Sequence, residues 1–177
     1  MSARLVGGDP VEVLNRQAER AAVLVLGSRP LPGVRELFNS GSVTLSLTAH
    51  AGCPVVVVRD PEHVTQQPAY VVVGVDGSRT SQDAVDYAFE AAVLRCCGAA
   101  GRRESYPEVE LMHEVVRGHP VAVLTEASRH ALFPVVGTRG AGGFTGQLLG
   151  SVGQGVLHHA RCPVATVPGP VGPGGRR

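Results

Sequence analysis

The sequence is poor in aromatic residues. It contains no tryptophan, and aromatic residues make up only 4% of its 177 residues, although hydrophobic residues account for 44%. A core of this composition must consist of valine, leucine and alanine, which is typical of parallel sheets that are buried on both faces. A chain of this length can form one domain or two small ones.

Excess charge and long apolar runs are also lacking. The formal net charge is +1, so the broad basic surface that binds nucleic acid is not expected. No apolar run approaches the length needed to cross a bilayer. The first eight residues, MSARLVGG, lack the apolar segment of a secretory signal. We therefore expect a cytoplasmic protein that has neither a nucleic-acid nor a membrane partner.

The four cysteines form no C-x-x-C pair, which argues against a zinc ribbon or a thioredoxin-like site. Cys53 and Cys162 each precede a proline and a valine-rich stretch, and we expect both to be small buried hydrophobic residues. The vicinal pair Cys96 and Cys97 falls in a predicted loop, where redox sensitivity is a minor alternative. No metal site is expected, and the adjacent His158 and His159 suit a helix C-terminus.

A glycine-rich stretch follows a short apolar run at residues 134–136, which predicts the end of a buried strand. Residues 137–146 are mostly glycine and small polar residues, and a patterned segment begins near residue 151. A strand, a glycine loop and a helix in this order suit an anion, because glycine lets the backbone approach closely and helix N-termini attract phosphate. Ser151 would cap that helix or bind a phosphate.

The spacing within this stretch discriminates between known glycine motifs. The loop has no lysine, which excludes the Walker pattern. Residues 140–146 match the dinucleotide fingerprint only imperfectly. The pattern Gly137-x-x-Gly140, nine further residues and then Gly150-Ser151 resembles the nucleotide-binding signature of the universal stress protein family.

The chain also repeats itself. Four segments recur in the same order: residues 8–14 as 118–124, 25–29 as 135–139, 41–43 as 150–152, and 49–55 as 158–164. The first copy has one added residue between its second and third segments. Matched order over about fifty residues indicates duplication rather than a short-period solenoid.

The residue patterns predict alternating helices and strands. Helices are expected at residues 10–21, 42–51, 81–95, 119–130 and 151–160, and strands at 22–26, 54–59, 70–75, 109–116, 132–136 and 164–167. Such alternation favours an α/β fold with a doubly wound, Rossmann-like parallel sheet. Ligands of these sheets lie beyond the carboxyl ends of the strands.

Two loops follow predicted strands at that edge of the sheet. One is Asp76-Gly77-Ser78 and the other is the glycine loop at residues 137–151. If their strands are neighbours, the loops face one pocket, with Asp76 toward the ribose or adenine and the glycine loop around the phosphates. An Asp-Gly-Ser sequence after a strand can also be a simple turn.

The family resemblance extends over most of the chain. Residues 73–78 look like the opening strand and loop of a universal stress protein domain, and residues 116–167 look like its closing half. The resemblance implies an adenine nucleotide alpha-hydrolase-like sheet in the order 3-2-1-4-5, bound ATP with or without Mg²⁺, and dimers through the last strand. The predicted nucleotide-binding residues are Asp76, Gly77, Ser78, Gly137, Thr138, Arg139, Gly140, Gly150, Ser151 and Val152.

The sequence departs from the family pattern in two places. Between Arg95 and Tyr106 it has a short loop where the family has a strand and a helix. The first copy lacks an opening strand and has Pro30 at the position of Gly140, and proline removes a donor N–H. We expect the first copy to bind no nucleotide and to complete the assembly by pairing residues 54–59 with residues 164–167.

These observations predict a domain organisation. Residues 1–60 form an incomplete half-domain, 61–69 a linker, 70–168 a domain that lacks one strand–helix unit, and 169–177 a disordered tail. The last strands then join either two chains in a homodimer or the two copies within one chain.

Three functions remain open. The favoured one is an ATP-binding protein that acts in stress response through binding, without fast turnover, and is not an enzyme. A slow ATP hydrolase would need a general base and Mg²⁺ ligands, and Asp76 is the one carboxylate in the predicted set. A degenerate, non-binding protein-interaction or dimerisation module is the third, and the missing strand supports it.

Overall fold

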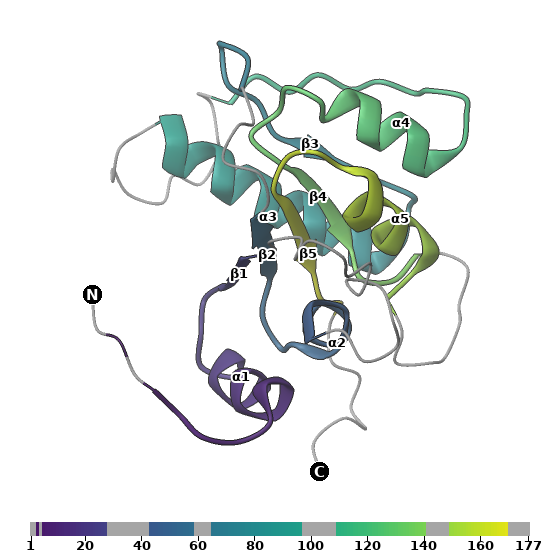
Figure 1. Cartoon of the computed structure of the whole chain (residues 1–177). Coiled ribbons are helices and arrows are strands. Elements are labelled where there is room, and N and C mark those ends of the chain that lie inside the picture. The colour runs from purple at the N-terminus through teal and green to yellow at the C-terminus, as the bar shows by residue number, and fades with distance from the viewer. Residues whose placement is uncertain are drawn as a thin grey trace.

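The computed structural model describes residues 3, 5–27, 43–58, 65–96, 109–140 and 149–169 (Figure 1). Helices and strands alternate along much of this part of the chain. The helices are α1 (Pro10–Ala18), α2 (Val43–His50), α3 (Arg79–Cys96), α4 (Pro120–Ala127) and α5 (Ser151–His159). The strands are β1 (Leu24–Gly27), β2 (Val55–Val58), β3 (Val72–Val73), β4 (Pro134–Gly137) and β5 (Val164–Val167).

The strands form one five-stranded sheet in the order β1-β2-β5-β4-β3. The pairs β1–β2, β4–β5 and β3–β4 are parallel, whereas β2 and β5 run antiparallel. The predicted α/β fold is thus confirmed, but an entirely parallel sheet is wrong, because two parallel sets of strands meet at the β2–β5 junction. That junction is the pairing expected between residues 54–59 and 164–167.

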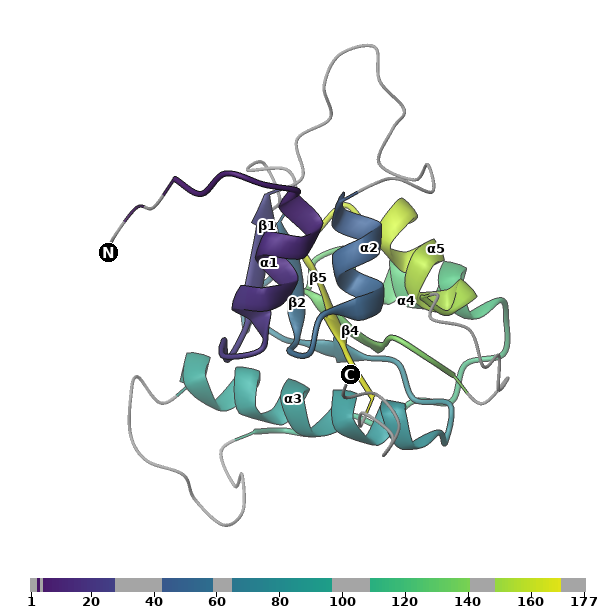
Figure 2. The ribbon, with the colours of Figure 1, turned by 90° about the horizontal axis from the view of Figure 1, so that it is seen from below.

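Helices cover both faces of the sheet, but unequally. Figure 2 shows α1, α2, α4 and α5 on one face and α3 on the other. Side chains alternate between the two faces along each strand. On the four-helix face, Val55, Val57, Val136 and Val164 belong to one buried cluster; on the α3 face, Val135, Ala165 and Val167 pack with Ala84 and Ala88 in a second. Each fully buried valine contributes about 1.5–3 kcal/mol.

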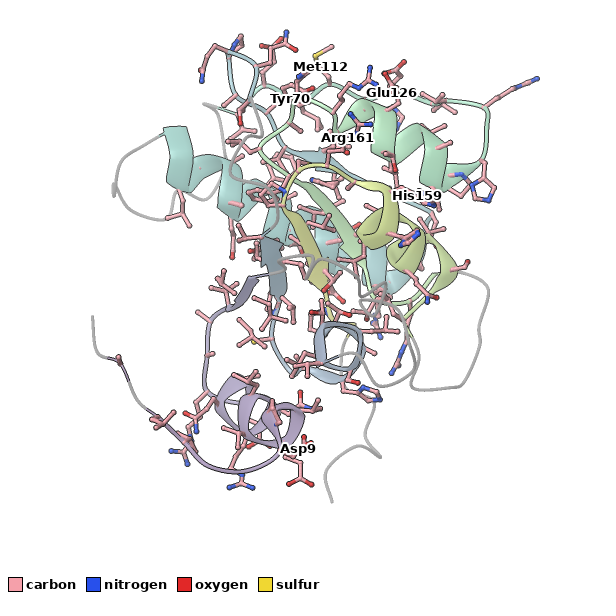
Figure 3. The ribbon with its side chains drawn as sticks, in the orientation of Figure 1. Asp9, Tyr70, Met112, Glu126, His159 and Arg161 are labelled. Carbon is pink, nitrogen blue, oxygen red and sulfur yellow. The ribbon has the colours of Figure 1, made fainter. Side chains whose placement is uncertain are left out.

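The strand predicted at residues 109–116 is absent. These residues form neither a helix nor a strand, and the side chains of Leu111, Met112 and Val115 are at least 68% exposed. Met112 lies at the outer boundary of the molecule in Figure 3. In the expected strand order 3-2-1-4-5, this segment would be the third strand. The third strand pairs only with the second, and the sequence lacks the second strand. An isolated apolar segment has no ladder to join.

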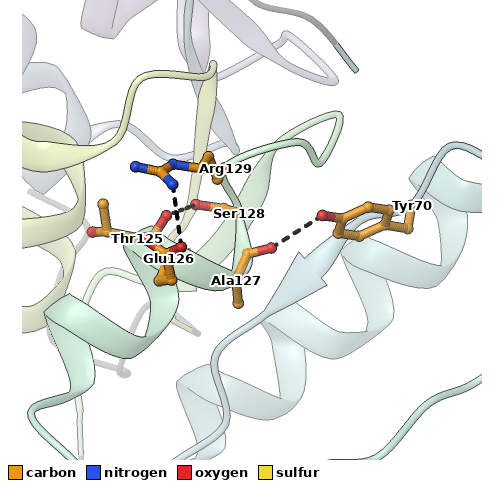
Figure 4. A network of polar contacts seen from close by, with 6 residues as sticks. All are labelled: Tyr70, Thr125, Glu126, Ala127, Ser128 and Arg129. Carbon is orange, nitrogen blue, oxygen red and sulfur yellow. Dashed lines mark hydrogen bonds and ion pairs between the residues drawn. The ribbon is translucent and has the colours of Figure 1, made fainter. Parts of the chain in front are cut away.

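The edge strand β3 is shorter than the predicted 70–75. Its backbone bonds nevertheless reach further, since Tyr70 O accepts from Leu132 N at 2.8 Å and Gly74 N donates to Val135 O at 3.0 Å. Among the described strands, β3 pairs only with β4. The Tyr70 hydroxyl donates to Ala127 O at 3.3 Å and so links this edge to the end of α4 (Figure 4).

The helix ends follow local capping. Helix α4 stops at Ala127 rather than residue 130, and beyond it the Ser128 hydroxyl donates to Thr125 O at 3.2 Å (Figure 4). Helix α1 stops at Ala18, and its first turn is capped by Asp9, whose Oδ1 accepts from Val11 N and Glu12 N. Residues 65–69 of the predicted linker carry no helix or strand. The predicted tail after Gly169 lies outside the described residues.

Candidate functional site

The loop after β3 is a tight turn that also starts a helix. Asp76 Oδ1 accepts from Ser78 N at 2.9 Å, and Gly77 has φ +78°, a conformation that favours glycine. The Ser78 hydroxyl accepts from Ser81 N at 3.2 Å, and the Ser81 hydroxyl donates to Ser78 O at 2.8 Å. Ser78 therefore serves as the cap of α3, which explains why that helix begins at Arg79 rather than residue 81.

The loop after β4 lies against this turn. A methyl group on Gly140 would lie 2.7 Å from Asp76 Oδ2, and one on Gly137 would lie 2.8 Å from Thr80 Cγ2. Such close approach is possible because glycine has no Cβ. The two loops meet because β3 and β4 are parallel neighbours, so that their carboxyl ends share one edge of the sheet. The convergence expected from the sequence is present.

The N-terminus of α5 lies at the same place. Gly150 N donates to Thr138 O at 2.8 Å, and Thr138 N donates to Val167 O at 2.9 Å, which joins the loop after β4 to both α5 and β5. Gly150 is the N-cap of α5, and no side chain of the described residues caps it. The first N–H groups of a helix have no partner within the helix.

Burial separates the predicted residues into two groups. Asp76, Arg139, Gly140 and Ser151 are exposed, so a ligand can reach them. Thr138 is 6% exposed, and Val152 packs against the core below the four-helix face. The side chains of these two residues therefore pack within the protein at this edge. Residues 141–148, the middle of the predicted glycine loop, lie outside the described residues.

Sequence reasoning missed Thr80. This side chain is 9% exposed and lies between two loops, because a methyl group on Gly169 would be 2.8 Å from its Oγ1 while Gly137 approaches its Cγ2. Thr80 therefore joins the ends of β4 and β5 to α3. No short motif marks it; the only available signal was the hydroxyl spacing of Ser78 and Ser81 at a helix start.

The remaining candidates for chemistry lie elsewhere. Cys53 and Cys162 are both buried, as predicted, and burial raises the pKa of the Cys53 thiol. The side chains of Cys96 and Cys97 lie outside the described residues. His158 and His159 meet edge-on with ring centroids 4.7 Å apart, at the end of α5, where Figure 3 shows His159. The described residues contain no cluster of three or more potential metal ligands, and none of their helices is long and apolar enough to span a membrane.

Comparison with known proteins identifies the family. The model of the universal stress protein family matches residues 2–59 and 97–168. The chain belongs to the universal stress protein family. A universal stress protein of Mycobacterium bovis is 34% identical and aligns over 93% of this chain and 68% of its own length. One from Mycobacterium tuberculosis is 36% identical over 85% of this chain and 62% of its own length.

Solved structures show the same fold at lower identity. A universal stress protein from Archaeoglobus fulgidus superimposes with a TM-score of 0.69 at 21% identity, over 92% of this chain and 66% of that one. A putative universal stress protein from Pseudomonas aeruginosa gives a TM-score of 0.62 at 15% identity, over 93% and 69%. This universal stress protein thus spans roughly two thirds of the length of these relatives.

Proposed function

We propose that this universal stress protein binds an adenine nucleotide, ATP with or without Mg²⁺, at the edge formed by the loops after β3 and β4 and the start of α5. It acts in stress response through this binding and not through fast turnover. The observation that carries the proposal is the contact of Asp76 with Gly140 beside a helix N-terminus that no described side chain caps.

The phosphate end of the nucleotide belongs at α5. A helix N-terminus carries about half a positive charge and offers unpaired N–H groups, both of which favour phosphate oxygens. Gly140 and Gly150 let the backbone approach a ligand without hindrance by a Cβ. The exposed guanidinium of Arg139 adds a positive charge on the same loop. The residues present therefore suit a polyphosphate.

The ribose end belongs at Asp76. A carboxylate accepts hydrogen bonds from hydroxyl groups, and the bond from Ser78 N holds this one in a fixed orientation. The carboxylate also suits Mg²⁺, which proteins usually hold through one or two carboxylates together with substrate phosphates. Asp76 can therefore orient either the sugar or the metal–phosphate group.

The same site argues for binding without catalysis. Phosphoryl transfer needs metal ligands and a residue that orients the attacking group, in addition to phosphate contacts. Of the ten predicted residues only Asp76 is a carboxylate. The first copy, with Pro30 at the position of Gly140, contributes no second nucleotide site in this proposal.

A protein-interaction module is the second candidate. The observation that favours it is the exposed apolar segment at residues 109–116. Large exposed apolar surfaces mark interaction sites. In this alternative the edge at Asp76 binds no nucleotide.

Calorimetric titration with ATP tests the proposal. We expect one nucleotide per chain, and affinity at least about tenfold weaker, equivalent to 1.4 kcal/mol, in Asp76→Ala and in Gly140→Ala. The methyl group of Gly140→Ala displaces the Asp76 carboxylate, whose flexible end can move, so the fold is retained. Asp86→Ala removes an exposed carboxylate on the same helix, α3, and serves as the matched control with unchanged affinity.

Two results would overturn the proposal. If the wild-type protein melts cooperatively but gives no binding heat with ATP, the protein-interaction module is the remaining candidate. Phosphate release above a protein-free blank, lost in Asp76→Ala, would make the protein an enzyme.

A further inference from the structure

β1 is the longer of the two edges of the described sheet. Among the described strands it pairs only with β2, and the sheet ends at β1 on one side and at β3 on the other. β5 lies inside the sheet between β2 and β4, so a second chain cannot pair with this last strand. β1 has four residues and β3 has two, so β1 offers another strand the longer edge.

Backbone N–H and C=O groups point outward from β1 at every second residue. Leu24 N donates to Pro54 O at 2.9 Å, so Leu24 faces β2. The backbone groups of Val23, Val25 and Gly27 therefore point away from β2, because these directions alternate along a strand. All three residues are exposed. They form a row of groups of the kind to which a further strand binds.

The outer edge of β1 lacks the residues that usually keep edge strands apart. Residues 21–28, AAVLVLGS, contain neither a charged residue nor a proline, which are common protections of an edge. Val25 is 58% exposed and lies beside Val56, which packs against the α3 cluster, so both valines belong to the α3 face. Val23 and Val58 lie on the same face and are 39% and 38% exposed. This edge therefore suits an apolar strand.

The pairing that uses most of the edge is symmetrical. Two β1 strands can run antiparallel with Val25 opposite Val25 of a second chain, and Val23 then lies opposite Gly27 of that chain. All three outward residues form hydrogen-bonded pairs in this register. Every other symmetrical register pairs fewer of the three. A two-fold axis therefore passes through the sheet at Val25.

The same axis carries the second chain's α3 to the uncovered part of the α3 face. α3 packs with Val167 at the end of β5 and leaves Val58 exposed. Because β2 runs antiparallel to β5, α3 lies at the end of the sheet where β1 and β2 begin. In both Figure 1 and Figure 2, α3 crosses the strands and ends beyond β1. After the two-fold rotation, the end of the second chain's α3 lies over Gly27 and Val58.

An exposed leucine lies near this end of α3. The side chain of Leu94 is 73% exposed. A methyl group on Gly27 would meet no described atom within 4 Å, so the surface beside Val58 has room for it. Burial of such a side chain against valine removes apolar surface of both chains from water.

We propose that the outer edge of β1 is the dimer interface between two molecules of this chain. The two β1 strands pair antiparallel about Val25, and Leu94 of each chain packs against Val58 of the other. The proposed nucleotide site lies at β3 and β4, on the other side of the sheet, so this inference is independent of nucleotide binding.

Sedimentation velocity over a range of protein concentrations tests the interface. The wild-type chain should sediment as a dimer that dissociates on dilution. Val25→Lys places two like charges opposite each other at the axis and should weaken association by at least about tenfold. Val115→Lys adds the same charge outside the interface and should leave association unchanged. Both valines are more than half exposed, so the fold of each chain is retained.

A matched pair of leucines tests the position of α3. Leu94→Asp should weaken association by at least about tenfold, because a carboxylate cannot be buried against Val58 without a partner. Leu111→Asp, at a leucine that is 68% exposed, should have no effect.

Disulfide trapping tests the register. In a background where Cys96 and Cys97 are serine, Val25→Cys should give a cross-linked dimer in oxidised glutathione, because residue 25 faces itself across the axis. Val23→Cys alone should not, since residue 23 faces residue 27 of the second chain. A mixture of Val23→Cys and Gly27→Cys chains should cross-link.

The outcomes are distinct. A chain that is monomeric at every concentration would overturn the proposal. A dimer that Val25→Lys leaves intact, or one that Leu94→Asp and Leu111→Asp affect equally, would assign the interface elsewhere and would also overturn it. Cross-linking at Val25→Cys together with dissociation by Val25→Lys and Leu94→Asp would support it.

Discussion

At the scale of single residues, glycine decides where backbones meet. Gly140 lies against the Asp76 carboxylate and Gly137 against Thr80, so two of the predicted binding residues are small because of their neighbours as much as for a ligand. The sequence revealed these positions because glycine spacing after a strand is visible in one dimension. It did not reveal Thr80, because nothing in the sequence shows which side chain the glycine contacts.

The pair Gly137 and Gly27 provides a matched prediction. In Gly137→Ala the new methyl group collides with backbone oxygens of Thr80 and Arg139, 3.1 and 3.2 Å away, which cannot yield as a flexible side chain can. We expect a loss of about 1–3 kcal/mol in the free energy of unfolding. Gly27→Ala has open space and should change it by less than about 1 kcal/mol, in the stabilising direction. Urea unfolding compares the two, and equal losses would contradict the packing described for α3.

At the scale of elements, the helices α1 and α4, which begin in equivalent segments of the sequence repeat, differ in how they begin. Asp9 caps α1 through two backbone N–H groups, whereas His119 at the start of α4 makes no side-chain cap bond, although both residues have nearly the same extended backbone, φ −65° and −73°. The helix starts could be predicted because proline follows each cap residue. The end of α4 could not, because the residue pattern shows neither the bond from the Ser128 hydroxyl to Thr125 O nor the bond from Tyr70 to Ala127 O.

The difference in capping predicts opposite effects of two substitutions. Asp9→Ala should lower the free energy of unfolding by about 1 kcal/mol, because two N–H groups lose their acceptor. His119→Asp should raise it by about 0.5–1 kcal/mol, because the same geometry then supplies an acceptor and a negative charge at a helix N-terminus. Thermal melts at constant pH measure both. A fall in stability for His119→Asp would show that the histidine has another role at this helix start.

The failed strand at residues 109–116 shows a limit of pattern reasoning. The segment has the composition of a strand, yet a strand exists only where a neighbour supplies hydrogen bonds, and here that neighbour is missing from the sequence. The same argument explains the short β3, which the apolar run of residues 70–75 made the most conspicuous strand in the chain. Residue patterns predict that a segment tends to be extended, whereas hydrogen bonding to a neighbouring strand decides whether it forms a strand.

At the scale of the whole molecule, the sheet joins two sets of strands through one antiparallel pair. The pairing of β2 with β5 was predictable from the repeat, because equivalent last strands can meet symmetrically. Which residues on each face of the sheet are covered by a helix could not be predicted, since only the structure shows that α3 covers Val135 and leaves Val25 exposed. We propose that the two copies divide their roles: the second carries the nucleotide site, and the first completes the sheet beside it.

Amide hydrogen exchange with and without ATP tests the central claim most directly, because it locates the ligand as well as detecting it. Bound nucleotide should slow exchange at residues 137–140 and 149–153, where the loop after β4 meets the start of α5, and should leave β1 at Leu24–Gly27 unchanged. Exchange that is unaltered at residues 137–140 and 149–153 under saturating ATP would contradict the account.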